Sequence, residues 1–71
     1  MKTEILGIIA QIAEVSIASV NEGTNLDSLG WDSLSNLAFI AEVDAKFSKE
    51  LSIELLLSAK IAGDLVALVD A

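Results

Sequence analysis

One short segment of the sequence carries residues that could do chemistry, and it reads Leu29-Gly30-Trp31-Asp32-Ser33-Leu34. A helix is expected to begin at Asp32 or Ser33, since both residue types are good N-caps. The hydroxyl of Ser33 would then stand at a rigid, exposed point beside a helix N-terminus. Backbone N–H groups and the positive end of the helix dipole favour a phosphate ester at such a point. Ser33 is therefore a candidate for attachment of a phosphate-linked group.

The tripeptide Asp-Ser-Leu is a weak signal alone, and it occurs twice, at residues 27–29 and 32–34. Serines that cap helices are far commoner than modified serines, so an ordinary cap is the alternative reading of Ser33. Ser28 is followed by Leu29-Gly30, which interrupts any helix, whereas Ser33 is followed by an amphipathic segment. If either serine is modified, the sequence favours Ser33.

Composition excludes most catalytic sites in this chain of 71 residues. It contains no cysteine and no histidine, which removes thiolate nucleophiles, Ser-His-Asp triads and the usual nitrogen and sulfur ligands of zinc. A core of this size leaves little room for a substrate pocket. We therefore expect no enzyme and no metal site, but a carrier, an interaction module or a subunit of a larger complex.

Charge and hydropathy restrict the partners and the location. Eleven acidic residues against four lysines give a net charge of −7. This charge disfavours nucleic acid and anionic membranes, and it favours partners that present a basic patch. No apolar run approaches the roughly 18 residues of a membrane helix. The short apolar run after Lys2 is interrupted by acidic residues and is a poor signal peptide, so we expect a cytoplasmic protein.

Hydrophobic periodicity predicts the helices that must position the segment around Ser33. A first helix is expected at about 3–15, a second at 33–47, a short third at about 53–58 with Ser52 as its cap, and a fourth at about 61–69. The stripe of the fourth comprises Ile61, Leu65, Leu68 and Val69. Residues 16–32 read as a long ordered loop whose apolar side chains tuck under the helices. The predicted fold is all-α: a single domain, 1–71, forming an irregular four-helix bundle with a long first loop and a short third helix.

The second predicted helix has two apolar faces. One has the bulk of a core face, with Phe39, Ile40, Val43 and Phe47. The other is smaller, with Leu34, Leu37, Ala38, Ala41 and Ala45. A bundle of this size cannot easily bury both, so the smaller face is either a docking surface or is covered by the long loop. Trp31 is expected to pack where the loop meets this helix.

Length, acidity, helix order and the motif around Ser33 together resemble the acyl carrier protein family over nearly the whole chain. Thr24-Asn25-Leu26 and residues 29–34 resemble the loop and attachment motif of that family. Residues 42–47 with Leu51 resemble the end of its acidic second helix, and residues 63–69 resemble its last helix. The Trp-Asp-Ser-Leu variant is similar to carriers that occur as discrete proteins in specialised pathways.

This resemblance implies that Ser33 bears a covalent 4′-phosphopantetheine arm, installed from coenzyme A by a phosphopantetheinyl transferase. The thiol of the arm would hold an acyl or aminoacyl group as a thioester for acyl-loading and acyl-processing enzymes. Asp32 would support the geometry that the transferase binds, and the carrier would act as a monomer. Partners with basic patches would dock on residues of the second helix, namely Leu34, Leu37, Ala41, Glu42 and Asp44.

The chain departs from the carriers of fatty acid synthesis at several positions. Ala38 and Ala45 stand where acidic residues are frequent, and Lys46 adds a positive charge. Ile61 replaces the small polar cap of the last helix, and the proline common before the third helix is absent. These departures disfavour service to the general fatty acid synthase and leave the cargo open. The alternative function is a helical protein–protein interaction module of the same fold without a prosthetic arm.

Overall fold

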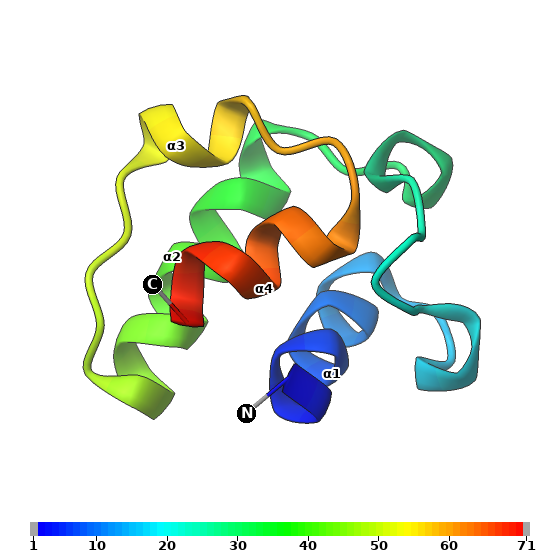
Figure 1. The fold of residues 1–71 in the computed structure, drawn as a ribbon, viewed down its shortest axis with the longest axis horizontal. Helices are drawn as coiled ribbons and strands as arrows, with labels where there is room; N and C mark the ends of the chain where they lie inside the picture. The colour runs from blue at the N-terminus through cyan, green and yellow to red at the C-terminus, as the bar shows by residue number, and fades with distance from the viewer. Residues whose placement is uncertain (1, 71) are drawn as a thin grey trace.

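Four α-helices form the body of the protein: α1 (Lys2–Ala13), α2 (Ser33–Phe47), α3 (Ile53–Leu57) and α4 (Ala62–Asp70) (Figure 1). This computed structural model describes residues 2–70, so residues 1 and 71 of the predicted domain 1–71 lie outside the described part. Within residues 2–70 the only β structure is an isolated bridge between Asn25 and Ile61. The predicted all-α bundle with a long first loop and a short third helix is confirmed.

The core is built where α1 packs against both α2 and α4. On α1, Ile5, Ile8 and Ile9 are buried and Ile12 is partly buried, at the spacing of one face of an amphipathic helix. The side chains that meet it from the other helices are Phe39, Val43, Leu56, Ala62, Leu65, Val66 and Val69. Removing this apolar surface from water is the main stabilising contribution of the fold.

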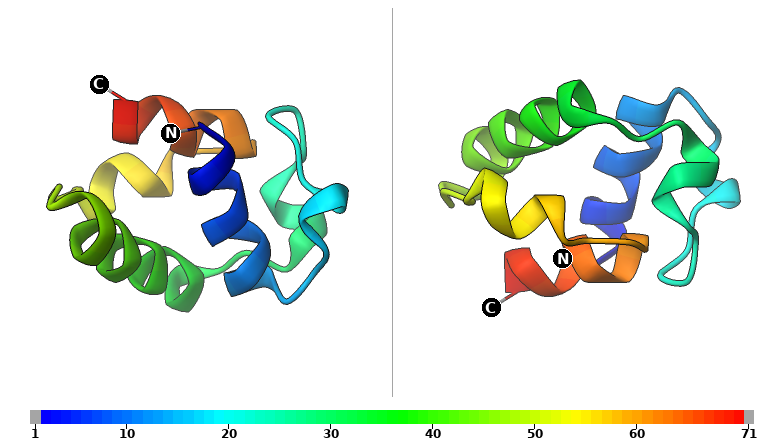
Figure 2. Two further views of the ribbon diagram at one scale, coloured as in Figure 1. Left: turned by 90° about the horizontal axis from the view of Figure 1, so that it is seen from below. Right: turned by 90° about the horizontal axis from the view of Figure 1, so that it is seen from above.

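The connection from α1 to α2 is more regular than predicted. It contains two single-turn 3-10 helices, η1 (Ile17–Ser19) and η2 (Leu26–Leu29). As expected, Val20 and Leu26 are buried and Leu29 packs against the core. Ile17, however, is 51% exposed, so the prediction that the apolar residues of the loop tuck under the helices was wrong for this residue. In both views of Figure 2, α1 lies between α3 and this connection. The connection packs on α1 and also reaches the start of α4 through backbone hydrogen bonds.

The start of α4 is held by the connection and by the side chain of Asp64. The N–H groups of Ala62 and Gly63 donate to the carbonyls of Thr24 and Glu22, at 2.9 and 2.7 Å. The carboxylate of Asp64 accepts from the N–H of Ile61 at 3.1 Å. These bonds satisfy the donors that a helix N-terminus leaves unpaired. The prediction that Ile61 lies on the helical stripe was wrong, because Ile61 precedes the helix and is exposed.

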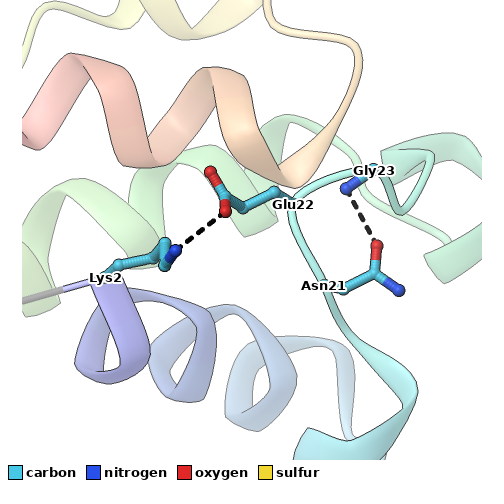
Figure 3. A network of polar contacts seen from close by, with 4 residues as sticks. All are labelled: Lys2, Asn21, Glu22 and Gly23. Atoms are coloured by element: carbon cyan, nitrogen blue, oxygen red, sulfur yellow. Dashed lines mark hydrogen bonds and ion pairs between the residues drawn. The ribbon is translucent and has the colours of Figure 1, made fainter.

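A tight turn shapes the part of the connection that reaches α4. The N–H of Gly23 donates to Oδ1 of Asn21 at 2.8 Å, and Nζ of Lys2 lies 3.0 Å from Oε1 of Glu22 (Figure 3). Thr24 closes the turn, because its N–H donates to the carbonyl of Asn21 and its Oγ1 accepts from the N–H of Asn21. The Lys2–Glu22 pair is half exposed and contributes little. The backbone of the turn therefore holds the carbonyls against α4.

Two other helix ends carry residues in the left-handed conformation. Glu14, at φ 59°, follows α1, and Ser48, at φ 54°, follows α2. After α1 the N–H groups of Val15 and Glu14 donate to the carbonyls of Ala10 and Gln11, which is the Schellman pattern. Ser52 stands at the predicted cap position of α3, but its side chain makes no capping bond.

No helix within residues 2–70 has the length and apolar character to cross a membrane.

Candidate functional site

The chain reaches Ser33 through two local devices that fix its path. Gly30 ends η2 at φ 73°, in a conformation that side chains with a Cβ rarely adopt. Asp32 is the N-cap of α2: its Oδ1 accepts from the N–H of Ser35 at 3.0 Å, and Oγ of Ser35 accepts from the N–H of Asp32 at 3.3 Å. This reciprocal arrangement is a capping box. Of the two predicted caps, Asp32 holds the position, and Ser33 is the first residue of the helix.

The Ser33 and Ser28 hydroxyls have different surroundings, although both residues are exposed. The Ser28 hydroxyl donates to the carbonyl of Asn25 at 2.6 Å. The Ser33 hydroxyl has no hydrogen-bond partner among residues 2–70. It stands in the first turn of a helix of 15 residues, at the positive end of the helix dipole. Ser33 thus presents a free hydroxyl from a fixed backbone.

The carboxylate of Asp32 stays ionised at neutral pH. The backbone N–H of Ser35, and then the hydroxyl of Ser35, donate to it and hold the pKa of Asp32 below its ordinary value. An ionised cap matches the positive end of the helix dipole. Asp32 therefore acts on Ser33 through the first turn of α2, since no direct hydrogen bond joins the two side chains in the described part of the chain.

Trp31 and Asn36 form a contact that the sequence analysis missed in part. Trp31 packs against the core, as predicted, and its ring meets Phe39 edge to face at a centroid distance of 6.1 Å. Its Nε1–H donates to Oδ1 of Asn36 at 2.6 Å. Asn36 had not been singled out. The signal was its spacing, because Asn36 lies five residues after Trp31, at the distance over which side chains pair across a helix start.

The smaller apolar face of α2 is open to solvent. Leu34 is 74% exposed and Leu37 is 55% exposed, while Ala41 and Ala45 are exposed as well. The alternative that the long loop covers this face is therefore wrong. Single exposed leucines are ordinary, but two on one helix face beside Ser33 form a continuous apolar surface.

Helix geometry divides the five predicted docking residues. With about 100° between successive residues, Leu34, Leu37, Ala41 and Asp44 share with Ser33 an arc of about 100°. Glu42 falls about 80° beyond that arc and is partly buried. The structure therefore brings four of the five residues together on the open face. The fifth, Glu42, lies on its flank.

The chain matches the family described as "Phosphopantetheine attachment site" over residues 3–69. It belongs to this family of phosphopantetheine-binding carriers. Members of this family carry a covalently attached 4′-phosphopantetheine and are non-catalytic carriers, which work with a phosphopantetheinyl transferase and with biosynthetic enzymes. The match favours a carrier over an interaction module without an arm. No curated protein matches the chain.

The described residues fit the covalent group that the family carries. A phosphate ester needs an accessible hydroxyl, and the hydroxyl of Ser33 is exposed and unengaged. The phosphate of such an ester is negative, and the positive end of the α2 dipole favours a negative group at this place.

Residues 2–70 contain no cluster of three or more acidic side chains arranged to hold a metal ion.

Proposed function

We propose that Ser33 bears 4′-phosphopantetheine and that the chain carries acyl or aminoacyl intermediates as a single monomeric carrier domain. The observation that supports this assignment is the free hydroxyl of Ser33 in the first turn of α2. When bound, the arm supplies a thiol that holds the cargo as a thioester. The chain itself supplies the fixed point from which the arm extends and a face on which partners dock.

Installation of the arm is a phosphoryl transfer onto Ser33. Oγ of Ser33 attacks the pantetheine-bearing phosphorus of coenzyme A and forms a new P–O bond. The phosphoanhydride bond breaks, and adenosine 3′,5′-bisphosphate leaves with the electron pair. The hydroxyl proton passes to a base of the transferase. Asp32 keeps the backbone of Ser33 in place by capping α2, and its own carboxylate is occupied by Ser35.

Two serine variants test the attachment site. We expect Ser33→Ala to abolish the gain in intact mass after incubation with coenzyme A and a broad-specificity phosphopantetheinyl transferase. Ser28→Ala is the matched control, because it changes the other Asp-Ser-Leu tripeptide, and we expect it to gain the arm as the parent does. A Ser33→Ala protein that still gained the arm would refute the assignment.

We propose that partners dock on the open face of α2 with Leu34 and Leu37 at its centre and with Asp44 and Glu42 at its edges. Basic patches on partners would meet the acidic residues, while apolar side chains would cover the leucines. Exposed charge pairs are screened over about 8–10 Å, so added salt should weaken binding to the transferase. Affinity that does not change with salt would contradict the role of basic patches.

A pair of variants separates the apolar and acidic parts of this surface. Leu37→Asp places a carboxylate within the exposed arc, where a partner would have to desolvate it. Glu42→Lys changes a flanking residue. We expect the first substitution to weaken transferase binding more than the second, measured as KM for the carrier. Equal or reversed effects would contradict an apolar centre for the docking surface.

A further inference from the structure

Asn36 is the one buried polar residue among residues 2–70, at 6% exposure. It lies in α2 on the side that faces the core, beside Phe39. A buried amide costs stability unless its hydrogen-bonding groups find partners. An apolar side chain of the same shape would have no such requirement. The amide is therefore explained only by what it binds, which is the indole N–H of Trp31 at 2.6 Å.

The positions of these two residues define their effect on the chain. Trp31 directly precedes the N-cap Asp32, and Asn36 is the fourth residue of α2. In many helices apolar residues at these two places touch and fix the angle at which the chain enters the helix. Here the contact is a hydrogen bond, and the edge-to-face packing of Trp31 on Phe39 supports it. Ser33 lies inside the short segment that this contact closes.

Trp31 is anchored on its other side as well. Its backbone N–H donates to the carbonyl of Leu26 at 3.2 Å, and Leu26 is buried. The backbone of Trp31 thus binds the first residue of η2, and its side chain binds the second turn of α2. The capping box fixes the backbone around Asp32 and Ser35. Together the two devices leave Ser33 little freedom except rotation of its own side chain.

We propose that Trp31 and Asn36 are positioning residues, whose hydrogen bond holds Ser33 in the orientation that the phosphopantetheinyl transferase uses. This inference rests on the proposed attachment at Ser33. Neither side chain reaches the reacting atoms, so the pair acts through the backbone. Loss of the bond should lower kcat for transfer of the arm and leave KM for the carrier nearly unchanged, because the docking residues stay in place.

Three variants test the pair by single-turnover and steady-state transfer kinetics. Trp31→Phe keeps an aromatic ring against Phe39 but removes the N–H donor, and Asn36→Leu keeps the branched shape but removes the acceptor. We expect each to lower kcat by about fivefold, the effect of one typical neutral hydrogen bond. The double variant places Phe opposite Leu and forms an apolar staple, so we expect it to recover most of the parent's kcat.

A stability control separates positioning from loss of fold. Ile8→Val changes a buried residue of α1 that lies outside the site, and it should destabilise the protein modestly. All proteins are assayed well below their unfolding midpoints. The proposal would be overturned if both single variants kept the kcat of the parent. It would also be overturned if an equally destabilised Ile8→Val protein lost as much kcat as they do, or if the double variant recovered no kcat. Arm transfer to a Ser33→Ala protein would instead refute the attachment site itself.

Discussion

Replacing Gly63 by alanine should destabilise the protein, although alanine is the better helix former. In an exposed helix interior the exchange stabilises by about 1 kcal/mol. Gly63 is the second residue of α4, and a Cβ there would lie 2.9 Å from the carbonyl oxygen of Glu22. That oxygen belongs to the backbone, so it cannot rotate away. The same oxygen accepts the N–H of Gly63 at 2.7 Å.

The size of the effect follows from the bonds that would have to move. The turn at residues 21–24 holds the Glu22 carbonyl through its own hydrogen bonds, and the neighbouring Thr24 carbonyl accepts from Ala62. Displacing the turn weakens two hydrogen bonds to α4, each contributing about 1 kcal/mol. The remaining steric overlap between the new Cβ and the carbonyl oxygen of Glu22 adds to this loss of stability. Subtracting the gain in helix propensity leaves a net loss of about 1–2 kcal/mol. For a domain of 71 residues that corresponds to about 7–13 °C in Tm.

Gly7→Ala is the matched control for this experiment. Gly7 lies within α1, and the nearest atom to an added Cβ is Cδ1 of Ile17, at 3.4 Å. That contact is ordinary, and the Ile17 side chain is half exposed and free to shift. The same substitution should therefore stabilise by about 0.5–1 kcal/mol. Urea unfolding followed by circular dichroism measures both. Two stabilising effects of similar size would refute the clamp on α4.

Three further outcomes are expected. Glu14→Gly should stabilise by about 0.5–1 kcal/mol, because Glu14 occupies the left-handed position after α1 at φ 59°; an unchanged urea midpoint would show that no strain is stored there. Lys49→Met should destabilise by about 0.5–1 kcal/mol, because the ammonium group binds a carbonyl in the last turn of α4; an unchanged Tm would contradict this. The backbone N–H of Lys60, and then that of Ile61, donate to the carboxylate of Asp64 and lower its pKa. The stability that the ionised carboxylate gives to the fold is therefore complete above its ordinary pKa of 3.8, and it is lost as the pH falls through the lower pKa of the folded protein. Asp64→Asn should therefore flatten the decline of the urea midpoint between about pH 5 and pH 2; an identical decline in both proteins would assign acid sensitivity to other groups.

The sequence predicted α2 with both ends correct, because the signals for this helix are local. Asp32 is a strong cap, and apolar residues recur with helical period from Leu34 to Phe47. The exposure of its second face was one of two alternatives that the sequence left open, because a small core cannot easily bury two faces but the long loop could have covered the second. The family and its cofactor were predicted from a resemblance in length, acidity, helix order and the motif around Ser33 taken together, and the family match confirms both. Whether Ser33 carries the arm stays a prediction.

The start of α4 was predicted to within one residue, but the contacts that hold it could not be predicted from nearby residues. Its N–H groups bind carbonyls about forty positions earlier in the chain, at Glu22 and Thr24. Such bonds leave no side-chain signal, because any residue has a carbonyl. This explains why Ile61 can stand where a polar cap was expected. Asn36 was missed for a related reason: a single polar residue in an amphipathic pattern is assigned to the solvent face unless its partner is known.

A carrier of the proposed kind has two requirements that oppose each other on one helix. The attachment point must be rigid, whereas the face beside it must stay open to successive partners. In α2 the buried side chains of Phe39 and Val43 fix the helix to the core without using the exposed arc. The start of the helix is fixed by polar contacts, the capping box and the Trp31–Asn36 bond, which add no apolar cover over Leu34 or Leu37.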